Sequence, residues 1–163
     1  MTPDAPSLVA ELARLLRDEP GFTGDADSGD LLVSGLLDRH HPMAWRRLDA
    51  FEAVEALTLF PALPAGPGEL PPWRDPGWSV EWRDSPDGDV LTLWWHAAQG
   101  QAMLVSQIPF GDLRPDTVAR TLRLHRDGLA ACRLRARDTE AAPTHPPRGA
   151  TWSQARVVYP GFA

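Results

Sequence analysis

The chain has 163 residues, a formal net charge of −6 and 43% hydrophobic residues, which is typical of a globular domain that buries a core. It contains no run of about 18 apolar residues, so we predict no membrane span. Its first residues show neither the basic nor the apolar part of a secretory signal. Cys132 is the single cysteine, which excludes an internal disulfide. We therefore expect a cytoplasmic protein without a membrane partner.

The first predicted element is a helix over residues 7–18, with Asp4 or Ser7 as its N-cap. Its leucines recur on one helical face, and Gly21 follows its end. The apolar run 30–38 is too short for periodicity to separate a buried helix from a strand. A second, long helix is predicted over residues 43–59 and ends before Pro61. Its apolar stripe consists of Leu48, Phe51, Val54 and Leu57.

Residues 61–76 contain six prolines, which neither a helix nor a sheet accommodates. We expect an extended connector here. It is either a true linker or a strap held on the surface by Leu63, Leu70 and Trp73.

A three-stranded antiparallel meander is predicted after the connector. Residues 78–82 alternate between apolar and polar, and residues 90–96 and 102–108 are apolar stretches of strand length. Ser85-Pro86-Asp87-Gly88 is a turn sequence between the first two strands.

A helix is then predicted from Gly111 to about Asp127, with Gly128 as its stop signal. Two further strands are predicted at residues 129–137 and 151–159. The resulting fold class is α+β, with N-terminal helices followed by a mostly antiparallel sheet in the order β-β-β-α-β-β. We expect one domain over residues 1–163, with a helical part at 1–60 and a sheet part at 77–163.

This order of elements resembles that of secretion-chaperone-type folds and of related bacterial modules that act by binding a protein. The resemblance lies in the order of a leading helix, three strands, a helix and two strands. It implies protein binding and carries no functional residues.

The sequence predicts no catalytic residues, no metal site and no cofactor. It contains no G-x-S-x-G elbow, no Gly-rich phosphate loop and no HExxH pair. Adjacent His40 and His41 suit a polar helix start better than a metal site. His96, His125 and Cys132 are expected to be core residues, and a small enzyme that uses them is the second alternative function.

Arginine and tryptophan supply the candidate binding residues. Arg133, Arg135 and Arg137 alternate along the predicted strand 129–137 and would share one sheet face, with Arg120 and Arg123 on the preceding helix. Trp94 and Trp95 are consecutive and would point to opposite faces of a strand. The competing interpretation is that acidic residues of the same chain neutralise these arginines.

The charge is unevenly distributed. Residues 1–89 hold 17 acidic and 7 basic side chains, a net charge of −10, whereas residues 90–163 hold 5 and 9, a net charge of +4. We predict a non-enzymatic protein-interaction or chaperone-like module that binds a partner, or a second copy of itself, through a sheet face or groove with Trp and Arg. The first alternative is a nucleic-acid-binding accessory protein that uses the arginines, although the overall acidity opposes it.

Overall fold

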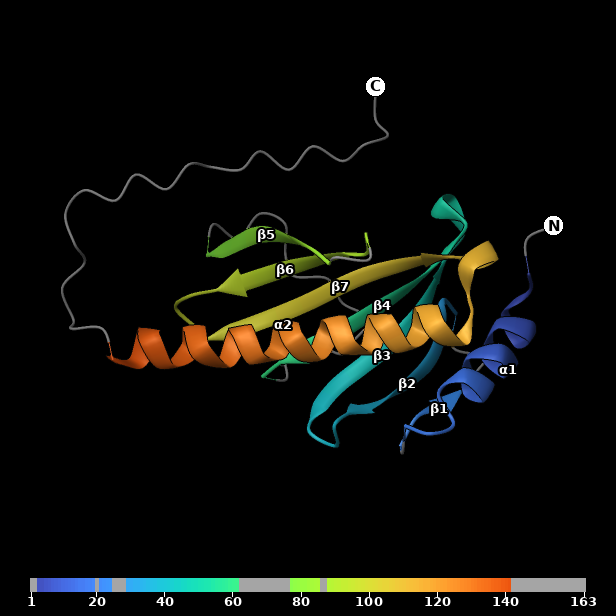
Figure 1. Cartoon of the computed structure of the whole chain (residues 1–163), viewed down its shortest axis with the longest axis horizontal. Coiled ribbons are helices and arrows are strands. Elements are labelled where there is room, and N and C mark those ends of the chain that lie inside the picture. The colour runs from blue at the N-terminus through green and yellow to red at the C-terminus, as the bar shows by residue number, and fades with distance from the viewer. Residues whose placement is uncertain (1–2, 20, 25–28, 62–76, 86–87, 142–163) are drawn as a thin grey trace, which may run out of the picture.

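The computed structural model describes residues 3–19, 21–24, 29–61, 77–85 and 88–141. Seven strands form one antiparallel sheet with the spatial order β1-β2-β3-β4-β7-β6-β5 (Figure 1). The strands are β1 (Thr23–Gly24), β2 (Leu31–Leu37), β3 (His41–Leu48), β4 (Ala53–Phe60), β5 (Trp78–Asp84), β6 (Val90–His96) and β7 (Gln101–Pro109).

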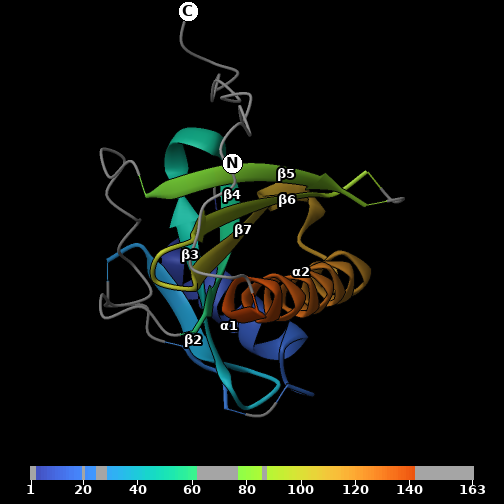
Figure 2. The same ribbon diagram turned by 90° about the vertical axis from the view of Figure 1, so that its left-hand side faces the viewer.

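Two α-helices lie on the same face of this curved sheet (Figures 1 and 2). Helix α1 (Ala5–Leu15) packs against β1 and β2, and α2 (Pro115–Ala141) lies across β4, β6 and β7. The main hydrophobic core fills the space between helices and sheet. Its largest fully buried side chains include Leu12, Leu32, Trp45, Leu93 and Leu104.

Helix α1 confirms the prediction from its leucines. The Asp4 side chain caps the helix by accepting a hydrogen bond from the Ser7 backbone N–H at 2.8 Å. Leu8 and Leu12 are buried on the face that meets the sheet. The amphipathic pattern therefore identified both the element and its buried side.

The predicted helix over residues 43–59 is wrong, because this segment forms β3, a short 3-10 helix η1 (Asp49–Phe51) and β4. Strand β4 is covered on both faces of the sheet and nearly all its residues are buried. Its sequence therefore lacks the alternation of apolar and polar residues that marks a half-exposed strand. The turn between the strands is completed by Glu52 in the left-handed conformation, with φ 47°. A glutamate there gives no turn signal in the sequence.

Residues 31–37 form strand β2, which decides between the two alternatives for this apolar run. The meander after the connector is confirmed: β5 pairs with β6, and β6 pairs with β7, both antiparallel. Of the predicted connector over residues 61–76, only Pro61 is among the described residues. Residues 62–76 lie outside them.

The predicted strand over residues 129–137 is also wrong, because α2 continues through Gly128 to Ala141. Gly128 is buried where the helix comes closest to the sheet, and it does not end the helix. A Cβ atom at this position would lie 2.7 Å from Leu91 Cδ2 and 2.9 Å from Leu104 Cδ2. The strand predicted at 151–159 lies outside the described residues.

The fold is therefore α+β with a mostly antiparallel sheet, but the predicted order of elements is not observed. In the part of the chain that the structure describes, one helix precedes all seven strands and the long helix follows them. Strand β4 pairs with β7 over eight residue pairs, so a single sheet joins the predicted helical part to the predicted sheet part.

A second apolar cluster lies on the face of the sheet opposite the helices. It consists of Leu57, Leu59, Trp94, Met103 and Val105, with Trp78 and Val80 packed against it. Side chains alternate along a strand, so Trp95 points into the main core while Trp94 joins this second cluster. The predicted opposition of the two tryptophans is confirmed.

Replacing Gly128 by a β-branched residue tests the close approach of α2 to the sheet. We expect Gly128→Val to lower the free energy of unfolding by about 1–3 kcal/mol, because the added methyl groups would press into Leu91 and Leu104. Chemical denaturation measures the change. Ala119→Val on the exposed side of the same helix is the matched control, with an expected cost below about 1 kcal/mol. Equal stability of both variants would contradict the packing described.

Candidate functional site

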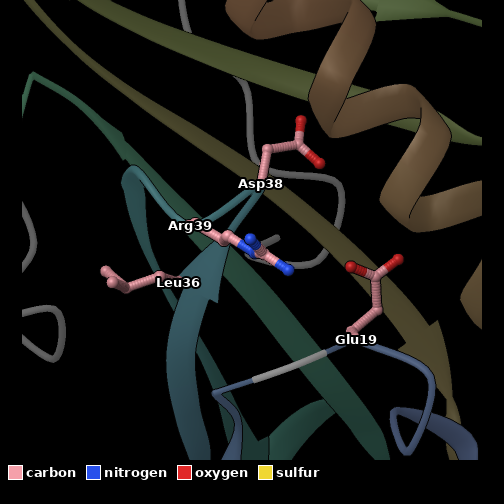
Figure 3. A pocket seen from close by; sticks show the side chains of 4 residues that line it. All are labelled: Glu19, Leu36, Asp38 and Arg39. Atoms are coloured by element: carbon pink, nitrogen blue, oxygen red, sulfur yellow. The ribbon is translucent and has the colours of Figure 1, made fainter.

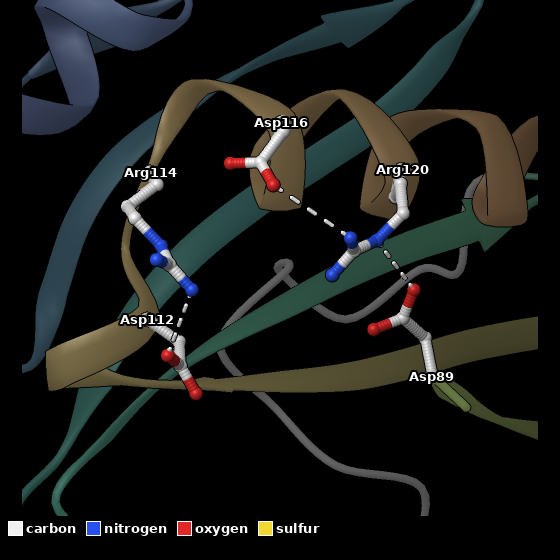
Figure 4. Close-up of polar contacts among 5 residues, drawn as sticks. All are labelled: Asp89, Asp112, Arg114, Asp116 and Arg120. Carbon is white, nitrogen blue, oxygen red and sulfur yellow. Dashed lines mark hydrogen bonds and ion pairs between the residues drawn. The ribbon is translucent and has the colours of Figure 1, made fainter. Parts of the chain in front are cut away.

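The arginines of α2 divide into two groups according to their partners. Arg120, near the start of the helix, reaches back to the sheet. Its Nε lies 3.0 Å from Asp89 Oδ2, which immediately precedes β6, and its Nη1 lies 3.7 Å from Asp116 one turn earlier (Figure 4). Arg114 makes a separate ion pair with Asp112 at 3.2 Å. The ion pair of Arg120 with Asp89 thus holds α2 against the sheet.

Arg126 joins three separate segments of the chain. It donates to Glu19, which follows α1, at 2.6 Å, and to Asp38 in the β2–β3 turn at 2.8 Å. Glu19, Asp38, Leu36 and Arg39 line a surface hollow of about 230 Å³ (Figure 3). Arg126 engages both carboxylates, so its single positive charge compensates one of their two negative charges within the protein.

Arg135 lies on the opposite side of α2 from Arg126. It forms an ion pair with Glu81 of β5, and its guanidinium carbon lies 5.5 Å from the ring centre of Trp95. The predicted Arg–Trp combination therefore occurs, but as an internal contact between α2 and the sheet. Trp95 is only 4% exposed, and Trp94 is buried on the opposite face of the sheet.

These contacts explain much of the uneven charge of the sequence. Arg120, Arg126 and Arg135 of the basic second half pair with Asp89, Glu19, Asp38 and Glu81 of the acidic first half. The two halves face each other within one fold, so the neutralisation considered as the competing interpretation applies to Arg120 and Arg135.

The remaining arginines lie together on the outward side of α2. Arg123, Arg133 and Arg137 are exposed, and none makes an ion pair with a carboxylate of the described residues. A helix turns by about 100° per residue, which puts these three and the exposed Ala130 and Leu134 within an arc of about 100°. We call these five residues the arginine face.

The structure thus brings together three of the five predicted arginines, on a helix and not on a sheet face. Arg133 and Arg137 are one turn apart, whereas Arg135 lies well round the helix from both. Sequence reasoning missed Leu134, which at 62% is the most exposed large hydrophobic side chain among the described residues. Its spacing from Arg123 and Arg137 would have indicated the face if residues 129–137 had been assigned to a helix.

Arg133 has an unusual partner. Its Nη2 lies 2.8 Å from Nε2 of His41 at the start of β3. A guanidinium only donates hydrogen bonds, so His41 must accept through Nε2 and is neutral. Burial, together with the positive charge of Arg133, lowers the pKa of His41. The contact orients Arg133 without cancelling its charge.

The residues considered for catalysis are closed off in the core. His125 is fully buried, and its ring nitrogens lie 2.7 Å from Thr58 Oγ1 and 2.8 Å from Ser106 Oγ. Cys132 is buried on the inward side of helix α2 and does not lie in a strand. His96 is 6% exposed at the end of β6, with Trp78 against it edge-on. Their predicted burial is confirmed.

No metal-binding arrangement is found among the described residues, where three or more His, Cys, Asp or Glu side chains would have to converge. His40 is at the tip of the β2–β3 turn, and His41 is engaged by Arg133. The polar helix start that we expected at His40 and His41 is wrong, because these residues end a turn and begin a strand.

We found no family model, no curated protein and no solved structure that matches this chain. Within the described segments, neither helix combines the length and apolar character required to cross a membrane.

The burial of His125 predicts a specific pH dependence of stability. Burial lowers its pKa from 6.5 to about 3, so the folded protein keeps the ring neutral while the unfolded chain binds a proton below pH 6.5. Stability is therefore lost as the pH falls below 6.5. Relative to His125→Gln, the loss should approach about 1.4 kcal/mol per pH unit. Denaturation curves measured over this range check it, and a pH-independent difference between the two proteins would contradict it.

Proposed function

We propose that the protein is a non-enzymatic interaction module that binds another protein through the arginine face of α2. The observation that carries this proposal is the exposed Leu134 set among three exposed arginines without carboxylate partners in the described part of the chain. Arginine is enriched at protein interfaces and among the residues that dominate their binding energy, and Leu134 adds apolar area that a partner can bury.

The exposure of this face is not a requirement of the fold. Arg120, Arg126 and Arg135 hold α2 against the sheet and its neighbouring segments through ion pairs. The inward side of the helix supplies its core residues. Arg123 and Arg137 make no such contribution to the described structure. A partner that pairs with them would gain ion pairs without breaking any that stabilise the fold.

The nucleic-acid alternative uses the same arginines but fits the face less well. Asp127 and Asp138 are exposed beside it, and carboxylates there would repel a phosphate backbone. Leu134 offers apolar contact that a phosphate backbone cannot use. We also propose a cytoplasmic location, for which the single, buried Cys132 is the support.

Photo-crosslinking of the full chain in its source cells tests the proposal. We expect Leu134→p-benzoylphenylalanine to give protein adducts, and we expect them to disappear when Arg133→Glu and Arg137→Glu are added. The same replacement at Phe51, which is 52% exposed on η1, is the matched control and should give no adduct that depends on these arginines.

Two results would contradict the proposed function. One is the absence of protein adducts at position 134 in cells that contain the folded protein. The other is a set of adducts identical to those at position 51, because contact would then not depend on the arginine face. Circular dichroism of each purified variant establishes that it is folded before the comparison is made.

A further inference from the structure

We infer that the partner segment is an acidic amphipathic helix, which lies along α2 with its apolar side on Ala130 and Leu134 and its carboxylates on Arg123, Arg133 and Arg137. The inference rests on the proposed function and specifies the chemistry of the partner. Its basis is the complementarity of charge and apolar contact that the arginine face requires.

The three arginines of the face are spread along the helix within an arc of about 80°. Arg123 and Arg137 are 14 residues apart, which corresponds to about 21 Å along the helix axis. Along the axis, Arg133 lies between them, and it points toward β3, where its guanidinium donates a hydrogen bond to His41. A straight segment of about 14 helical residues spans this distance, with a carboxylate on each of about four turns.

Arg133 is oriented before any partner arrives. His41 takes one of the five N–H donors of its guanidinium, and no carboxylate of the described residues takes another. A guanidinium held in this way keeps less rotational freedom to lose when a partner binds. Its planar donors suit two-point recognition of a carboxylate.

The apolar seam determines that the segment is amphipathic. Leu134 is 62% exposed, and Ala130 lies one turn before it on the same face. A small residue lets a second helix approach closely, while Leu134 supplies the side chain that fills the interface. A purely acidic segment would leave Leu134 in contact with charged groups.

Asp127 and Asp138 add selectivity. Both are exposed, and they lie on the edge of the face away from Arg133. Carboxylates of a partner on that edge would be repelled, so the acidic residues of the partner must lie away from it. Such repulsion selects among acidic helices by the arrangement of their charges and not by their number.

Fluorescence anisotropy with defined probes tests this inference on the full chain. The first probe is a synthetic peptide of about 16 residues, built from Glu, Leu and Ala, with leucines on one face and glutamates along one edge. The second probe has the same composition with the glutamates distributed around the helix. The third probe is a DNA duplex of similar length.

We expect the first peptide to bind and its affinity to fall as the salt concentration rises. Arg133→Glu with Arg137→Glu should weaken binding roughly tenfold or more, because each change replaces an attraction by a repulsion. Arg14→Glu with Arg17→Glu alters the net charge equally on exposed residues in the last turn of α1 and just after it, and should leave the affinity within about twofold. Leu134→Asp should also abolish binding of the peptide.

Equal affinity for the two peptides would overturn the inference, as would tighter binding of the DNA duplex or no binding of either peptide. The crosslinking at position 134 then separates the two proposals. Protein adducts at Leu134 together with failure of the acidic peptide would leave the interaction module standing with a partner of different chemistry. Absence of both would remove the proposed function as well.

Discussion

The docking of α2 onto the centre of the sheet is the constraint on which the remaining structure depends. Gly128 removes the side chain that would hold the helix away from Leu91 and Leu104. His125, one turn earlier, is fixed between hydroxyl groups of β4 and β7. A close approach and a polar contact together determine the rotation of the helix, since a buried imidazole without its hydrogen bonds would cost free energy.

That rotation decides which arginines are available for binding. Once His125 points into the sheet, Arg120 and Arg135 come within reach of Asp89 and Glu81, while Arg123 and Arg137 turn outward. The sequence shows only a basic second half. The structure converts it into an internal group of arginines that joins the helix to acidic strands and turns, and an outward group on one face.

The sequence was sufficient for the first helix and for the meander, because α1 has a single apolar face and strands β5 to β7 follow recognisable turns. It failed at β4, where burial on both faces removes the period of two, and at the turn before β4, where a glutamate occupies the left-handed position. It failed again at Gly128, where tertiary packing and not helix termination requires glycine. The shared face of Arg123, Arg133 and Arg137 could not be found without knowing that residues 129–137 continue the helix.

The position of β7 has a consequence for how the chain is synthesised and folded. Strand β7 lies between β4 and β6 in the sheet, although in the described part of the chain it follows the other six strands. During translation, β4 therefore leaves the ribosome with one hydrogen-bonding edge open, and the cover that α2 provides is made later still. The sheet is complete only when β7 pairs with both β4 and β6, at its middle and not at its edge. Until then β4, which is buried on both faces in the folded protein, is exposed to pairing with other chains, so we expect the interval before β7 and α2 emerge to carry the greatest risk of aggregation.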